Sequence, residues 1–140
     1  MAYATQADIT DGYGGDLLLI VSDRNGDGEI DATAVARALA AATALIESFL
    51  AVRYPTPLTT VPDLVRDMCV DIALYKLAGG GVGPTDEMRL RYEDALSLLK
   101  RIADAKANLD ILQPAEPAGA GDVLLVAGDR VFTPDSLRHF

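Results

Sequence analysis

A chain of 140 residues, half of them apolar, is long enough to bury one hydrophobic core, so we expect one compact domain with extensions. Its 21 acidic side chains outnumber 12 basic ones, which gives a net charge of −9 and argues against binding to nucleic-acid phosphates. The single cysteine, Cys69, excludes an internal disulfide and a cysteine-rich metal site. It lies within an apolar helical pattern, which is typical of a buried thiol.

No run approaches the roughly 18 to 20 apolar residues that cross a bilayer, and residues 1–6 lack the pattern of a signal peptide. We therefore expect the protein to be made and kept in the cytoplasm, without membrane contact. Its one histidine, His139, is next to the last residue, and no motif of a serine hydrolase, zinc protease or P-loop NTPase is present. We expect no catalytic residues and no enzyme.

Two short segments open the chain. Thr5 followed by Asp8 resembles a capping box and predicts a helix over residues 6–12, ended by a group of glycines. Asp16 is then expected to cap a second, apolar segment over residues 17–21. Five apolar residues in a row are compatible with a buried strand or with one or two helical turns. We favour the helix because no partner strand is evident nearby.

Residues 23–31 place oxygen-bearing side chains at alternate positions around Gly28, which is the pattern of a loop that wraps calcium. The candidate ligands are Asp23, Asn25, Asp27, Asp31 and the carbonyl of Glu29. The twelfth position, which supplies a bidentate glutamate in a full EF-hand loop, is Ala34, so we expect weak binding at millimolar calcium at most. The same residues also suit a tight turn that binds nothing, with Asp31 as the N-cap of the next helix.

Three longer helices are predicted at residues 32–54, 63–78 and 84–107, separated by prolines and glycines. Apolar residues at spacings of three and four predict one buried face on each helix. The first face consists of Val35, Leu39, Ala42, Leu45, Ile46, Phe49 and Leu50. The second consists of Leu64, Val65, Met68, Cys69, Ile72, Tyr75 and Leu77, and the third of Met88, Tyr92, Ala95, Leu99 and Ile102. The predicted fold class is therefore mainly α, a small helical bundle of three to four main helices.

The last part of the chain differs in kind. Residues 114–121, rich in Pro, Ala and Gly, predict a linker that follows a helical domain over residues 1–113. Beyond it, residues 122–140 predict a C-terminal extended or β-hairpin arm, which is marginal in water without something to pair with. The apolar residues of this arm are therefore candidates for binding a partner, namely Val123, Leu124, Leu125, Val126, Val131, Phe132, Leu137 and Phe140.

Several short motifs occur in a fixed order along the chain. They are residues 1–8 (MAYATQAD), 23–28 (DRNGDG), 50–58 (LAVRYPTPL), 61–62 (VP), 91–96 (RYEDAL) and 130–138 (RVFTPDSLR). In this order they resemble the Mu-like phage family of head-tail connector proteins, also called adaptor or head-completion proteins. The resemblance runs nearly from one end of the chain to the other.

The resemblance implies a mostly helical structural protein of the virion, assembled in the host cytoplasm as a dodecameric ring between the portal and the tail of a tailed phage or prophage. The implied partners are further copies of the chain, the portal protein and a tail-side completion or stopper protein. DNA would pass through the channel without specific binding, and an acidic subunit suits such a channel.

Two other functions stay open from the residues alone. One is a protein-interaction module of EF-hand or dockerin-like type that binds calcium weakly through residues 23–31. The other is a small enzyme that uses Asp67 and Asp71, which lie one helical turn apart, although such a pair is usually only a solvated surface.

Overall fold

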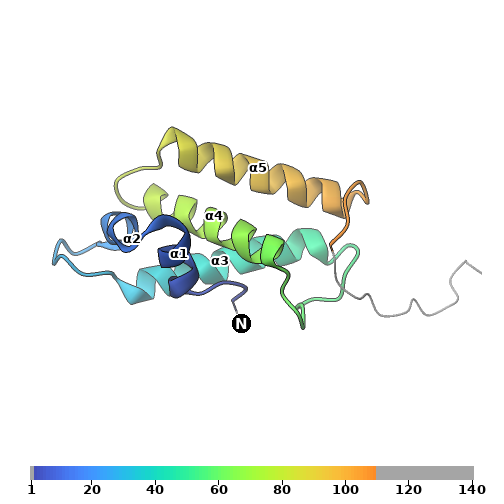
Figure 1. The fold of residues 1–140 in the computed structure, drawn as a ribbon, viewed down its shortest axis with the longest axis horizontal. Helices are drawn as coiled ribbons and strands as arrows, with labels where there is room; N and C mark the ends of the chain where they lie inside the picture. The colour runs from blue at the N-terminus through green and yellow to red at the C-terminus, as the bar shows by residue number, and fades with distance from the viewer. Residues whose placement is uncertain (1, 110–140) are drawn as a thin grey trace, which may run out of the picture.

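The computed structural model describes residues 2–109, and within this range the protein is built from helices without a strand. Three long helices run side by side, and two short ones pack at one end of them (Figure 1). The elements are α1 (Gln6–Tyr13), α2 (Gly15–Ser22), α3 (Ala32–Leu50), α4 (Asp63–Gly79) and α5 (Asp86–Ala103). The prediction of a mainly α bundle is confirmed, whereas the predicted C-terminal hairpin arm lies outside the described residues.

The two short helices form as the capping residues predict, with one exception. The Asp8 amide donates to Thr5 Oγ1 over 3.3 Å and the Thr5 amide donates to Asp8 Oδ2 over 2.7 Å, which completes the capping box of α1. Residues 17–21 are helical, as favoured. The expected cap of α2 by Asp16 is wrong, because Gly14, with a φ of 92°, ends α1 and directly begins α2, which places Asp16 inside the first turn.

The helix α4 lies at the centre of the fold and contacts all four other helices among the described residues. A helix packed on several sides buries more than one stripe of side chains. Its buried residues are Val65, Met68, Cys69, Val70, Ile72, Ala73, Leu74, Leu77 and Ala78. The prediction of a single buried face therefore missed Val70, Ala73, Leu74 and Ala78, and it was wrong for Leu64, which is 42% exposed. The expected burial of Cys69 is confirmed, and burial raises the pKa of its thiol.

Helix α3 ends at Leu50, four residues earlier than predicted, because the next residues turn toward α5. The Arg53 guanidinium donates to the carbonyls of Ile102 (2.8 Å) and Ala107 (3.0 Å), and the Tyr54 hydroxyl accepts from the Leu109 amide (3.0 Å). These bonds hold the end of α3 against the end of α5. They also fix the position of Leu109, the last described residue.

Helix α5 likewise ends earlier than predicted, at Ala103 instead of residue 107. Ala105 adopts a left-handed φ of 65°, and the Lys106 amide donates back to the Arg101 carbonyl over 2.8 Å. This arrangement is a Schellman-type helix end, which satisfies a carbonyl of the last turn.

Helix α3 is long and apolar enough to cross a membrane by length and composition alone, contrary to the sequence expectation. Alanine supplies much of this apolar character. The helix also carries Arg37 and Glu47, and one face of it packs against α4 and α5. A core helix of a soluble bundle passes the same test, so this finding by itself does not indicate a membrane protein.

The N-terminal segment is fastened to the bundle by Tyr3, which is 3% exposed. Its amide donates to Thr43 Oγ1 on α3 over 3.0 Å. Its hydroxyl donates to Glu47 Oε1 over 2.8 Å and accepts from the Leu58 amide over 2.9 Å. Burial, together with the neighbouring Glu47 carboxylate, raises the pKa of Tyr3 to about 12. One side chain therefore joins the N-terminal segment, α3 and the loop that precedes α4.

We expect Tyr3→Phe to lower the free energy of unfolding by about 1–3 kcal/mol, because it leaves the buried Leu58 amide without its acceptor. Urea unfolding at neutral pH measures the change. The control is Tyr92→Phe, since the Tyr92 ring stacks on Tyr75 at 4.1 Å between centroids and its hydroxyl has no bond within the described residues. Equal unfolding midpoints for the two variants would contradict the role given to Tyr3.

Candidate functional site

The predicted calcium loop, between α2 and α3, is closed by an aspartate that accepts backbone N–H groups. The Asp23 carboxylate accepts from the amides of Gly26 (2.7 Å), Asp27 (3.2 Å) and Gly28 (3.0 Å). These bonds, led by the one from Gly28, lower the pKa of Asp23. Gly26 and Gly28 adopt φ angles of 73° and 79°, which lets the chain wrap tightly around the carboxylate.

Two more of the candidate ligands are used in the same way. Asp27 Oδ1 accepts from the Glu29 amide over 2.9 Å, and Asp31 Oδ1 accepts from the amides of Thr33 and Ala34 in the first turn of α3 over 3.0 and 3.1 Å. The role of Asp31 as N-cap is thereby confirmed, and Asn25 points outward as an exposed residue. Across residues 2–109, no three His, Cys, Asp or Glu side chains gather closely enough to hold a metal ion. With Ala34 at the twelfth position, this donor set fits calcium poorly and fits a structural turn well.

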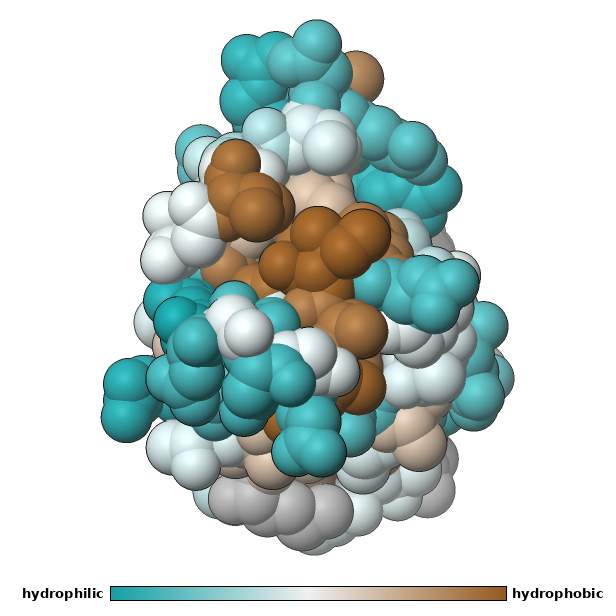
Figure 2. All heavy atoms as spheres, turned by 90° about the vertical axis from the view of Figure 1, so that its left-hand side faces the viewer, coloured by the Kyte–Doolittle hydropathy of each residue, from teal (hydrophilic) through white to brown (hydrophobic). Residues whose placement is uncertain are grey.

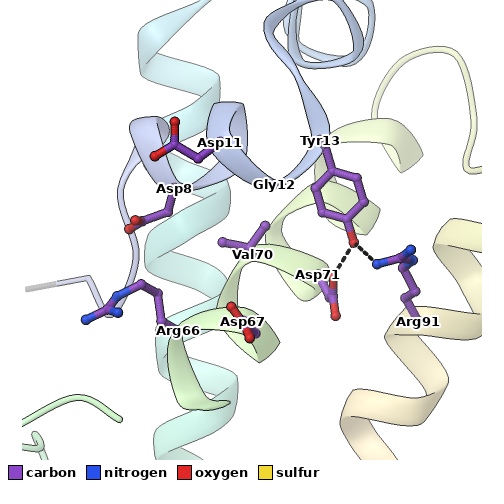
Figure 3. Close-up of a pocket in the computed structure, with 9 residues that line it drawn as sticks. All are labelled: Asp8, Asp11, Gly12, Tyr13, Arg66, Asp67, Val70, Asp71 and Arg91. Carbon is purple, nitrogen blue, oxygen red and sulfur yellow. Dashed lines mark hydrogen bonds between the residues drawn. The ribbon is translucent and has the colours of Figure 1, made fainter. Parts of the chain in front are cut away.

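A polar cleft of about 440 Å³ lies between α1, α4 and α5 (Figure 3). At its edge the Tyr13 hydroxyl donates to Asp71 Oδ1 and accepts from the Arg91 guanidinium over 3.0 Å. The same guanidinium lies 5.2 Å from the centre of the Tyr13 ring and donates to Glu87 Oε1 over 2.8 Å. The cleft is lined by Asp8, Asp11, Gly12, Tyr13, Arg66, Asp67, Val70, Asp71 and Arg91.

Burial shifts the pKa of two groups in this network. The Tyr13 hydroxyl is partly buried and donates to a carboxylate, and both effects raise its pKa. The pKa of Asp71 is also raised, because burial outweighs the lowering by the Tyr13 hydrogen bond and by the charge of Arg91. A tyrosine with a raised pKa stays protonated at neutral pH, so it holds its proton in place as a donor to Asp71.

The cleft joins three helices by side chains that come from distant parts of the sequence. Asp71 is half-buried, which corrects the interpretation of Asp67 and Asp71 as an equivalent surface pair, since only Asp67 is exposed. Sequence reasoning missed Tyr13 and Arg91 as its partners, and no spacing between them signals that they meet. The hydrogen bonds of Tyr13 with Asp71 and Arg91 hold α1 against α4 and α5.

Comparison with known proteins places this chain among phage proteins. The family described as Bacteriophage Mu, Gp36 matches residues 3–127, a range that includes every described helix and the predicted linker. The chain belongs to this family. It is 30% identical over 136 residues to gene product J of Escherichia phage Mu, a match that covers 95% of each chain. Over 82 residues it is 35% identical to the Mu-like prophage FluMu protein gp36 of Haemophilus influenzae, which covers 59% of this chain and 57% of the relative.

The predicted membership in a Mu-like phage family is thus confirmed, whereas the head-tail connector role stays a prediction. The family match covers residues 23–31 and the first part of the predicted arm, up to residue 127. The candidate partner-binding residues of the arm all lie outside the described residues, so they stay predictions. They are Val123, Leu124, Leu125, Val126, Val131, Phe132, Leu137 and Phe140.

The raised pKa of Asp71 predicts a specific pH dependence of stability. Because the folded-state pKa lies above the unfolded value, the stability linked to protonated Asp71 is present at low pH and is lost as the pH rises through the folded pKa. Asp71→Asn keeps an acceptor for Tyr13 and removes this loss. In urea titrations, the stability of Asp71→Asn minus that of wild type should therefore increase from pH 3 to pH 7. Asp11→Asn, which removes an exposed carboxylate of the same cleft, is the control and should show a smaller trend.

Calcium is expected to bind this protein no more tightly than the millimolar range, because Asp23 and Asp31 already accept hydrogen bonds from backbone amides and Ala34 offers no oxygen. Isothermal titration with calcium, alongside the Asp23→Asn variant, measures this. A micromolar affinity that disappears in Asp23→Asn would contradict the expectation and would restore the loop as a calcium site.

Proposed function

We propose that this Gp36-family protein is a structural virion subunit of a tailed phage or prophage, which assembles as a dodecameric ring between the portal and the tail. The similarity to gene product J of phage Mu over 95% of both chains carries the proposal. In this role the protein is a head-tail connector, or adaptor, that completes the head. Its partners are further copies of the chain, the portal protein and a tail-side stopper protein.

The division between a finished helical body and a further segment supports this role. The body buries a continuous core over residues 2–109, so it needs no partner to fold. The exit point at Leu109 is held by Tyr54 and, on the preceding residues, by Arg53. Residues 110–140 then carry apolar stretches beyond a Pro-, Ala- and Gly-rich sequence. A rigid body with a separate apolar segment suits a subunit that is completed by its neighbours.

The charges of the body suit a channel that DNA passes without binding. The whole chain has a net charge of −9, and several arginines of the body lie beside a local acid that neutralises them. The ion pairs are Arg66 with Asp63, Arg89 with Asp86 and Arg91 with Glu87, at 2.6, 3.2 and 2.8 Å. Such exposed pairs add little stability, but they leave less free positive charge for phosphates.

A non-enzymatic role accounts for the polar cleft. Tyr13, Asp71 and Arg91 bind one another, and a protonated tyrosine bonded to a carboxylate is not poised as a base or nucleophile at neutral pH. The cleft is then an internal brace of the connector body and does not require a substrate.

Deletion of residues 122–140 tests the proposed function. Because the core of residues 2–109 is complete, the truncated protein should keep its helical circular dichroism and its cooperative melting. It should be absent from purified particles, since the segment that contacts neighbours is gone. The full-length chain and an Asp16→Asn variant, which changes an exposed residue of the body, serve as controls and should be incorporated. Normal incorporation of the truncated protein would refute the docking role, and absence of the full-length chain from particles would refute the connector function.

A further inference from the structure

An apolar patch covers the end of the molecule that is formed by α2 and the turn between α4 and α5. Figure 2 views this end and shows hydrophobic side chains gathered in its middle, with hydrophilic ones around them. Ile20 on α2 is 57% exposed and Val82 in the turn is 67% exposed. The turn lies against α2, because a Cβ on Gly81 would come within 3.8 Å of the Val21 carbonyl. We call Ile20 and Val82, with half-buried Leu17 one turn earlier on α2, the apolar end patch.

A basic cleft of about 550 Å³ lies between the first half of α3, the end of α4 and Arg24. Three cations line it, namely Arg24, Arg37 and Lys76, around an apolar floor that includes Ala38 and Leu77. Arg37 and Lys76 make no hydrogen bond or ion pair within residues 2–109. The one acid in the lining, Asp31, already accepts the first amides of α3. On a protein with a net charge of −9, this cleft is therefore a local positive surface.

Arg24 connects the basic cleft with the turn that carries Val82. Its guanidinium donates to the carbonyls of Gly80 over 2.9 Å and Leu77 over 3.2 Å. Leu77 belongs to the floor of the basic cleft, and Gly80 begins the turn that carries Val82. The end of the molecule thus offers apolar area beside positive charge, which fits an extended segment that is apolar in its middle and acidic at its ends.

One segment of this chain has that composition. Residues 122–129 read DVLLVAGD, an apolar run with an aspartate at each end. They lie outside the described residues, and the 12 residues between Leu109 and Asp122 can extend over about 40 Å. Helix α5, with its 18 residues, is only about 27 Å long. The segment can therefore reach well past the body from which it starts.

The position of Leu109 favours a neighbouring molecule as the receptor. Leu109, the last described residue, is held where α3 and α5 end, while the apolar end patch lies at the opposite end of the bundle, beside α2 (Figure 1). We infer that the apolar end patch and the basic cleft bind residues 122–129 of a second copy of this chain. Such a head-to-tail contact joins two different surfaces of identical subunits, and repetition of it closes a ring when the rotation allows. The inference rests on the proposed connector ring and names the surfaces that join its subunits.

Disulfide trapping between two singly substituted full-length chains tests the inference. Val82→Cys is placed in one chain and Leu125→Cys in a second chain of different mass, and the mixture is oxidised mildly. Cys69 is fully buried and does not compete. The mixed dimer should form several-fold more than with Val52→Cys, which is a matched control because Val52 is 71% exposed and lies just after α3, away from the patch. Lys76→Glu in the first chain should lower the yield, and Asp122→Lys in the second should restore it.

Val82→Cys and Leu125→Cys are then combined in one chain, and their cross-linking is followed in assembled particles. A ladder of oligomers on a non-reducing gel is expected, whereas a monomer with an internal disulfide would show that the segment binds its own body and would overturn the inference. Cross-linking at the level of the Val52→Cys control, both in solution and in particles, would overturn it as well. In that case normal incorporation of the protein into particles leaves the connector function standing, so the two failures are distinguishable. Circular dichroism of each variant confirms that these exposed substitutions keep the fold.

Discussion

The burial of α4 is the constraint on which the rest of the structure depends. Each of the other described helices contacts it, and its side chains are buried around most of its circumference. Full burial of a large aliphatic side chain contributes about 1.5–3 kcal/mol, so Ile72, Leu74 and Leu77 together outweigh any single polar contact at the surface. Because α4 supplies apolar area on several sides, the other helices need to offer only one apolar stripe each.

Polar side chains at the edge of this core decide how the segments between helices lie. Tyr3 holds the N-terminal segment, Tyr13 joins α1 to α4 and α5, Arg24 joins the aspartate loop to the end of α4, and Arg53 joins the ends of α3 and α5. Each of these bonds links residues more than 40 positions apart in the sequence. They fix the positions of the first and last described residues relative to the helices.

The net charge of the chain is negative, but the charge of one part of its surface is positive. The excess of acid suits the proposed connector, past which DNA would have to slide. Several arginines are also neutralised by an acid one turn away on the same helix. The fold nevertheless brings Arg24, Arg37 and Lys76 to one cleft. A family of Mu-like phage proteins, a finished helical body and a positive, apolar end surface together support an assembly in which copies hold one another.

Local patterns in the sequence determined the helices, because a capping box at Thr5, the N-cap at Asp31 and apolar spacings act within a few residues. The apolar spacings also indicated a mainly α fold and the burial of Cys69, and the order of several short motifs resembled a Mu-like phage family. Only the tertiary structure decided that Leu64 faces solvent, that α4 is buried on several sides, and that Asp71 meets Tyr13 instead of standing at the surface. These outcomes depend on which helices pack against one another. Residues that meet across two helices are far apart in the sequence, so no local spacing predicts their contact.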